Sequence, residues 1–142
     1  FIPTSHGFDS YFGLLWSNDM EPNKKIIPKN ASMNLNPDPN WWNASLWRND
    51  KIIEQPTDPT KLTKRYTEEA TQFIRDNKKK PFFLYLAHTF PHVPLFASDK
   101  FRGKSPRGIY GDTVEEIDWS VGQVLETLRK EKLDKNKFRT KF

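Results

Sequence analysis

Two of the chain's three histidines, His88 and His92, lie four residues apart in the stretch PFFLYLAHTFPHVPLF. An imidazole can bind an oxyanion, polarise it or pass it a proton, because its ordinary pKa of about 6.5 is close to neutral pH. The pair is not a metal site by itself, because Pro91 and Pro94 exclude a helix and no third ligand is close in sequence. From the residues alone, His92 is either an anion-binding side chain or a loop histidine that makes a structural hydrogen bond.

A second polar group, Ser17-Asn18-Asp19, follows an aromatic stretch. These residue types are typical of a turn, because their side chains hydrogen-bond to nearby backbone groups. No histidine adjoins Ser17 in the sequence, so no neighbouring base would activate its hydroxyl as a nucleophile. The residues favour a turn here over a catalytic site, and we assign no catalytic residue and no metal ligand in this chain.

Two sets of charged residues have structural explanations beside functional ones. The basic side chains of one glycine-containing loop could hold an anion or simply face solvent: Arg102, Lys104 and Arg107. Acidic residues at the start of a predicted helix would complement the positive end of its dipole: Glu115, Glu116 and Asp118. Dipole complementarity therefore outweighs a role as paired acid–base carboxylates for the acidic set.

A helix and a strand are predicted ahead of the two histidines. Asp58 is a suitable N-cap with Pro59 at the first helical position, and apolar residues then recur at helical spacing to about Asn77. The continuous apolar run that follows predicts a strand over residues 82–87. Its length and aromatic content are typical of a strand covered on both faces, as in a parallel sheet.

A second helix is predicted after a loop with three glycines. Residues 112–115, Asp-Thr-Val-Glu, have the form of an N-terminal capping box, and apolar residues follow on one face until near Lys132. Residues 1–59 are predicted to be mostly irregular, apart from a short strand at Lys51-Ile52-Ile53-Glu54. Residues 60–132 would then form a helix-strand-loop-helix unit, and residues 133–142 an atypical tail.

These elements predict an α/β fold. In open α/β sheets, ligands bind beyond the carboxyl ends of the strands, which is where His88 and His92 lie. One covered strand cannot make a sheet, so its partner strands are expected outside this chain. We therefore interpret residues 1–142 as an internal segment of a larger domain.

Composition excludes several kinds of site. The chain has no Cys, which excludes disulfides, thiolate metal sites and a cysteine nucleophile within it. The net charge of +5 mildly favours anionic partners such as sulfate, phosphate or acidic polysaccharide. No recognised nucleic-acid-binding module is present. No run of about 18 apolar residues occurs, so no membrane span is expected.

The start of the chain and two glycosylation motifs bear on its origin. The chain opens on Phe1 without a basic-then-apolar leader, and we expect a processed product or a piece of something longer. The sequons Asn30-Ala31-Ser32 and Asn43-Ala44-Ser45 would accept glycans in a eukaryotic secretory route.

Four blocks of the sequence resemble, in order, the type I sulfatases of the arylsulfatase A group. They are HGFDSYFGLLWSNDM (6–20), IIEQPTDPTKLTKRYTEEA (52–70), KPFFLYLAHTFPHVPLFAS (80–98) and RGIYGDTVEEIDWSVGQVLETL (107–128). The resemblance covers nearly the whole chain except roughly residues 21–50 and the end. It implies an alkaline-phosphatase-like sandwich with a mostly parallel central sheet, incomplete in this chain, and sulfuric ester hydrolysis as the activity of the family.

The resemblance implies two substrate-binding residues. His92, in Phe-Pro-His-Val-Pro, matches the family histidine that hydrogen-bonds the substrate sulfate. Ser17, in Trp-Ser-Asn-Asp, matches a serine that lines the substrate site, although Leu15-Trp16 stands where Pro-Tyr is common. The family also uses a formylglycine made from cysteine and a calcium ion held by acidic pairs. Neither the cysteine nor these pairs is recognisable here, so we expect this chain's residues to bind neither cofactor.

The resulting hypothesis is a segment of an arylsulfatase-like sulfuric ester hydrolase that contributes part of the sulfate-binding pocket and is inactive alone. Its expected partners are a sulfated small molecule or glycan and the remainder of the sulfatase domain, with no nucleic acid and no membrane. The expected compartment is secreted, periplasmic or lysosomal in type. The alternative hypothesis is a non-catalytic, sulfatase-derived module that binds sulfated glycans, and nucleic-acid binding is a third.

Overall fold

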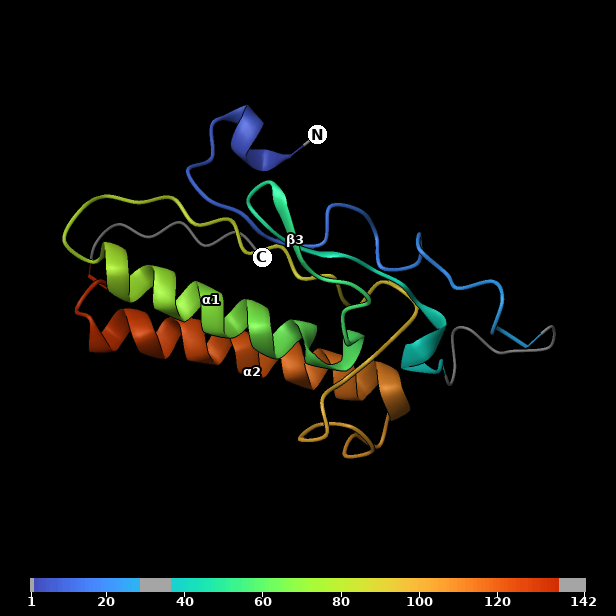
Figure 1. The fold of residues 1–142 in the computed structure, drawn as a ribbon. Helices are drawn as coiled ribbons and strands as arrows, with labels where there is room; N and C mark the ends of the chain where they lie inside the picture. The colour runs from blue at the N-terminus through green and yellow to red at the C-terminus, as the bar shows by residue number, and fades with distance from the viewer. Residues whose placement is uncertain (1, 29–36, 136–142) are drawn as a thin grey trace.

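The computed structural model describes residues 2–28 and 37–135. Within these ranges the chain forms two long helices, a small antiparallel sheet and long irregular segments (Figure 1). Short 3-10 helices at Pro3–His6, Pro39–Trp41 and Pro59–Lys61 interrupt the irregular segments. The chain thus has α/β content, with most of its regular structure in the helices.

Helix α1, Leu62–Asn77, ends where the sequence predicts. The Asp58 carboxylate accepts hydrogen bonds from the Thr60 backbone N–H at 3.0 Å and from the Thr60 hydroxyl at 2.6 Å. Pro59 follows as the first residue of the 3-10 turn that leads into α1. The predicted cap is confirmed, because the Asp58 side chain satisfies a backbone donor at the start of the helical run.

Helix α2, Gly108–Lys130, begins earlier than predicted. Asp112 lies inside the helix and is 2% exposed. Its carboxylate accepts backbone N–H groups from the preceding loop, at 2.7, 3.0 and 2.7 Å for Gly103, Lys104 and Ser105. The predicted capping box at 112–115 is therefore wrong, because Asp112 pairs with donors of the loop rather than with donors of its own helix.

Helices α1 and α2 lie side by side and point in the same direction (Figure 1). Thr67 donates to Ser120 at 2.6 Å, and Lys78 donates to Glu131 at 2.7 Å, with partners 53 residues apart in both cases. A constant sequence offset is what two parallel helices in fixed register require, since both rise equally per residue. The chain must therefore return along the helices between the end of α1 and the start of α2.

The returning chain contains the predicted strand, and here the structure differs from the prediction. In residues 81–88 exposed and half-buried side chains alternate strictly, which is the period of a strand. This stretch makes no backbone–backbone hydrogen bond with another described residue. Phe82 packs edge-on against α1, whereas Phe83 and Tyr85 are 74% and 71% exposed. The predicted strand over 82–87, covered on both faces, is an extended segment covered on one face.

The sheet of the described residues is antiparallel, with strand order β1-β2-β3. Its strands are β1, Phe12–Gly13, β2, Leu46–Arg48, and β3, Lys51–Glu54. Asn49, between β2 and β3, has a φ of 55°, a left-handed conformation that Asn tolerates better than most residues. The short strand predicted at Lys51–Glu54 is confirmed, but the mostly parallel central sheet is not formed by the residues described.

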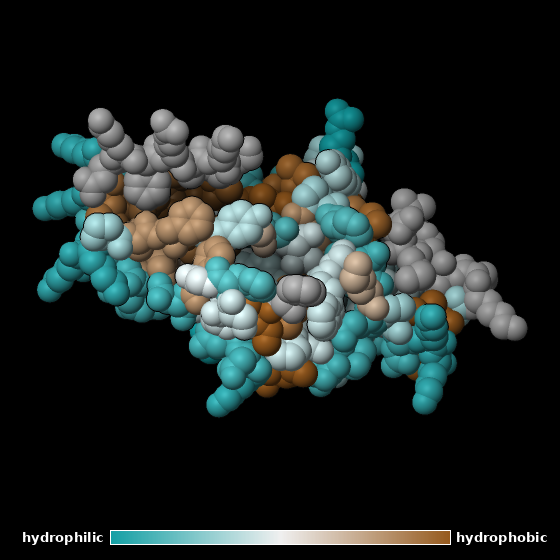
Figure 2. Space-filling view, turned by 90° about the horizontal axis from the view of Figure 1, so that it is seen from above, coloured by the Kyte–Doolittle hydropathy of each residue, from teal (hydrophilic) through white to brown (hydrophobic). Residues whose placement is uncertain are grey.

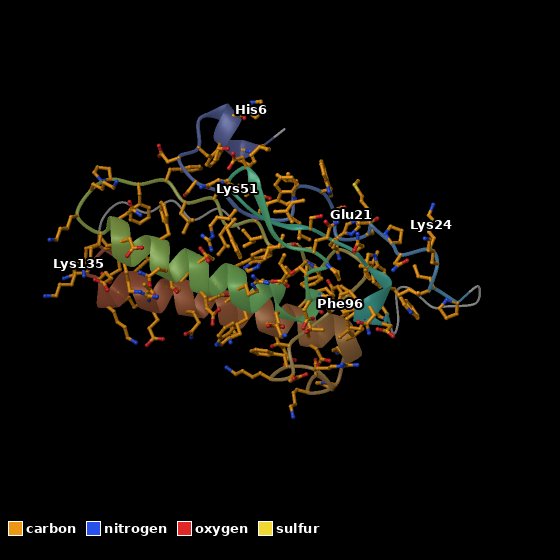
Figure 3. The ribbon with its side chains drawn as sticks, in the orientation of Figure 1. His6, Glu21, Lys24, Lys51, Phe96 and Lys135 are labelled. Atoms are coloured by element: carbon orange, nitrogen blue, oxygen red, sulfur yellow. The ribbon has the colours of Figure 1, made fainter. Side chains whose placement is uncertain are left out.

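The hydrophobic core lies between the sheet, the helices and the irregular segments. Its buried cluster comes from residues between 42 and 96: Trp42, Leu46, Leu62, Tyr66, Phe90 and Phe96. Phe96, labelled in Figure 3, lies near the start of α2. Large rings fill much of this core, because each aromatic side chain buries roughly 150–250 Å².

The irregular segment after β1 is held against the chain that precedes β2. The carboxylate of Glu21, labelled in Figure 3, accepts the backbone N–H of Ser45 at 2.9 Å. The Asn23 N–H donates to the carbonyl of Trp41 at 2.6 Å.

Seen from above, the molecule has hydrophobic side chains at its surface among hydrophilic ones (Figure 2). None of the helices in the described ranges is long and apolar enough to cross a membrane.

Candidate functional site

The fold brings together two polar residues that are 75 positions apart in the sequence. Ser17 lies in the irregular segment after β1, and His92 lies in the returning chain, just beyond the extended stretch. Ser17 Oγ and His92 Nδ1 are 3.5 Å apart. Ser17 is half-buried and His92 is exposed, so the pair lies at the surface of this chain.

The His92 ring has a defined tautomer. Its Nδ1 lies 2.6 Å from the backbone oxygen of Val93. A carbonyl oxygen only accepts hydrogen bonds, so Nδ1 must carry the proton of the neutral ring. The lone pair of the neutral ring is therefore on Nε2. Nε2 becomes a donor only when the ring takes a second proton, and an anion bound at Nε2 would then meet a positive charge.

Asp19 adds a negative charge beside the pair. The Ser17 hydroxyl donates to the Asp19 carboxylate, which lowers the pKa of Asp19 below its usual value, and the charge of His92 acts in the same direction. No histidine is close to Ser17 in the sequence, but the fold places His92 close to it in space. This histidine does not serve as its base, because Nδ1 already holds a proton that it donates to Val93. Ser17 is therefore suited to binding and not to nucleophilic attack.

Asn18 is a site residue that the sequence did not indicate. It is 4% exposed, and its Nδ2 donates to the carbonyl of Pro94 at 2.9 Å and to that of His92 at 3.4 Å. Its partners are 76 and 74 positions away, so no local pattern could have identified them. The turn predicted at residues 17–19 is confirmed, since the Met20 N–H donates to the Ser17 carbonyl at 3.1 Å, and this turn also contacts the His92 loop.

His88 belongs to a different environment. Its Nε2 lies 3.2 Å from the Ser120 hydroxyl of α2. Burial lowers the pKa of the His88 imidazole, because the charged ring would lose its hydration. His88 thus ties the end of the extended segment to α2 and takes no part in the pair formed by Ser17 and His92.

The charged residues noted in the sequence also have structural partners. Glu116 is 1% exposed, and its Oε2 accepts the Ser98 N–H at 2.8 Å, so complementing the helix dipole does not explain its position. Arg102 lines a cavity of about 230 Å³ together with residues such as Phe96 and Asp112. Neither Ser17 nor His92 lines this cavity, so it is separate from their site.

The cofactors implied by the resemblance do not fit the residues present. Calcium takes about six to eight oxygen ligands. Residues 2–28 and 37–135 contain no group of three or more His, Asp or Glu that could hold a metal ion. The chain has no Cys from which a formylglycine could form. Both groups would have to come from outside these residues.

Of the two sequons, only one falls in the described ranges. Asn43 is exposed, as a glycan acceptor must be, and Ser45 of the same motif is buried. Asn30 lies outside the described residues.

Comparison with known proteins gives matches over nearly the whole chain. The family model described as Sulfatase matches residues 2–138. The chain is 38% identical over 142 residues to the N-acetylgalactosamine-6-sulfatase of Mus musculus, covering 97% of this chain and 26% of the relative. It is 51% identical over 86 residues to the steryl-sulfatase of Homo sapiens, covering 61% of this chain and 15% of the relative.

Solved structures give a matching result. The fold is similar to the crystal structure of Ps i-CgsB in complex with k-i-k-neocarrahexaose, with a TM-score of 0.67 and 29% sequence identity. This similarity covers 92% of this chain and 31% of that one. The chain therefore spans less than a third of the length of each of these three proteins.

Proposed function

This chain belongs to the sulfatase family, and from that premise we propose that it is a segment of a sulfuric ester hydrolase in which His92 and Ser17 form one wall of the sulfate-binding pocket. The observation that carries the proposal is the 3.5 Å approach of Ser17 Oγ to His92 Nδ1 across 75 positions of sequence. Their proximity supports placing both residues, which the resemblance matched separately to the substrate site, in one pocket.

The chemistry of the pair suits a sulfate ester. In its protonated form His92 can donate through Nε2 to a sulfate oxygen, since Nδ1 is occupied by the Val93 carbonyl. Such a charge-assisted hydrogen bond is roughly twice as strong as a neutral one. Ser17 adds a neutral donor when its hydroxyl turns from Asp19 towards the ester.

These residues would bind a sulfate ester but would not cleave it. Cleavage needs an activated nucleophile, a cation on the sulfate oxygens and an acid for the leaving group. His92 and Ser17 supply hydrogen-bond donors only. We therefore propose that the chain is inactive alone and that the remainder of the sulfatase domain supplies the nucleophile, the metal site and the parallel strands beside residues 81–88.

The substrate class proposed is a sulfated small molecule or glycan. The alternative of a stand-alone glycan-binding module is less well supported, because the match to the sulfatase family model runs over residues 2–138. A secreted, periplasmic or lysosomal type of compartment stays a prediction.

The proposal is tested in a full-length sulfatase that carries this segment. His92→Ala should lower kcat/KM by about 10²–10³, the usual cost of removing one donor to a developing oxyanion. Ser17→Ala should lower kcat/KM by only about fivefold, since a neutral hydrogen bond contributes roughly 1 kcal/mol. Calcium affinity should change little in either variant.

His88→Ala is the matched control, because it removes the neighbouring imidazole from a structural contact. It should reduce stability while the folded fraction keeps most of its activity. A His92→Ala enzyme with kcat/KM near that of the parent would refute the assignment.

A further inference from the structure

We propose that Asn18 is the positioning residue of the His92 loop. Its buried amide binds the carbonyls of His92 and Pro94, and so fixes where the imidazole and its Nε2 stand. This inference rests on the proposed function, since the position of the ring matters to catalysis only if His92 meets the sulfate.

The returning chain has few other ties at this point. Residues 81–97 make no backbone–backbone hydrogen bond with described residues outside this stretch. A stretch without a hydrogen-bonded ladder depends on side chains to hold its carbonyls in place. Among the described residues, Asn18 supplies the side chain that holds the carbonyls of His92 and Pro94 from another part of the chain.

The burial of Asn18 indicates that its donors are what matter. It is 4% exposed, and its Oδ1 has no hydrogen-bond partner among the described residues. An apolar side chain would fill the same space without a buried, unpaired oxygen. What an amide adds is two N–H groups in a fixed plane, and these point to two carbonyls of one loop. In a buried setting such hydrogen bonds are stronger and more exacting in geometry than at the surface.

The neighbours of Asn18 act on the same imidazole. Ser17 Oγ lies 3.5 Å from His92 Nδ1, and the Asp19 carboxylate interacts with the charge of His92. Three consecutive residues thus interact with His92: Ser17 with its ring, Asn18 with its backbone carbonyl and Asp19 with its charge. Because Asn18 holds the backbone, its loss should free the ring from its contact with Val93 as well.

The first test uses this 142-residue chain and the nitrogen NMR signals of the His92 imidazole, assigned with the help of His92→Gln. In the parent chain the neutral ring should carry its proton on Nδ1. Asn18→Ala and the nearly isosteric Asn18→Asp both remove the donors, and both should lose this tautomer preference. Asn77→Ala is the matched control, because Asn77 also donates through Nδ2 to a backbone carbonyl, that of Phe73 at 2.8 Å. It should leave the His92 signals unchanged.

The second test uses a double-mutant cycle in a full-length sulfatase that carries the segment. Asn18→Ala should lower kcat/KM by roughly 10–100-fold, since a displacement of about 1 Å can cost 10²-fold. In the His92→Ala background the same substitution should cost nothing further, because Asn18 acts through His92.

Two results would overturn the inference. The first is a retained Nδ1 proton in both Asn18 variants. The second is loss of helical circular dichroism in both, since Asn18 would then hold the whole fold and not this loop. The NMR readout involves no sulfate, so it can succeed while His92→Ala proves harmless to catalysis. That outcome would refute the proposed function and leave the structural tie in place.

Discussion

His88 and His92 show how little separation is needed for two identical side chains to differ in role. His88 points into the protein towards Ser120, and His92 is exposed beside Ser17. In one continuous strand, residues four positions apart would face the same side. The chain turns at Phe90 and Pro91, between the two histidines, so they no longer share a face. A motif that counts histidines would treat the two alike, although only His88 contacts α2 and His92 stays exposed at the surface.

At the residue scale, His88 should make stability depend on pH. Burial lowers the pKa of His88 in the folded chain, so the unfolded chain binds the proton more readily. The stabilisation is complete above the ordinary histidine pKa of about 6.5 and is lost as the pH falls towards the folded-state value. Denaturant unfolding from pH 8 to pH 5 should show this fall, and His88→Gln should remove it.

His6→Gln serves as the control, because His6 lies on a short 3-10 helix far from α2 (Figure 3). It should keep the fall in stability seen in the parent chain. An unchanged pH dependence in His88→Gln would show that another group is responsible.

At the element scale, α2 organises the loop that precedes it. Burial raises the pKa of Asp112, but three backbone N–H donors more than offset this, and the net pKa lies below the usual value. Asp112→Asn should destabilise the chain by about 1–3 kcal/mol at pH 7, because hydrogen bonds to a charged acceptor are lost. The difference should shrink as the pH falls through the lowered pKa of Asp112, where the parent also loses its charge.

The measurement is chemical denaturation of both chains at several pH values. Asp118→Asn is the matched control, since Asp118 is exposed on the same helix. Equal losses in the two variants would mean that the loop contacts of Asp112 contribute nothing specific.

Local patterns predicted elements well where the partners were local. The cap at Asp58, the end of α1 at Asn77 and the strand at Lys51–Glu54 all depend on residues a few positions apart. The capping box at 112–115 failed because Asp112 found stronger partners in a loop seven to nine positions earlier. The Asp-Thr-Val-Glu pattern at 112–115 is compatible both with capping of its own helix and with binding of loop N–H groups.

The candidate site could be predicted only in part. His92 and Ser17 were identified through resemblance, but nothing in the residues showed that they would meet. Their contact, and the hydrogen bonds of Asn18, span 74 to 76 positions and depend on how the whole chain closes. The strand over 82–87 was predicted from its residues, but its covering depends on neighbours that those residues do not specify.

At the scale of the whole molecule, we expect the chain to lack catalytic activity, because the nucleophile and the metal site of the family would lie outside it. The purified chain should not hydrolyse a chromogenic aryl sulfate, because it has no Cys to form the nucleophile of its family. Calcium should leave its melting temperature unchanged, since a ligand stabilises a protein only by binding its folded state. Thermal unfolding with calcium, and with magnesium as the control, checks this. A rise in melting temperature that grows with calcium concentration, or turnover that survives further purification, would contradict the expectation.

The extended stretch of residues 81–88 also makes the chain divisible. A protease that cuts after aromatic residues would find Phe83 and Tyr85 exposed on a strand-like backbone, the shape that proteases bind. The cut would leave α1 on one piece and α2 on the other. The two pieces would still be joined by the contacts between Thr67 and Ser120 and between Lys78 and Glu131. In a longer protein that contains this segment, resistance to such cleavage would show that neighbouring strands cover the face that carries Phe83 and Tyr85. No assay of catalysis would be needed.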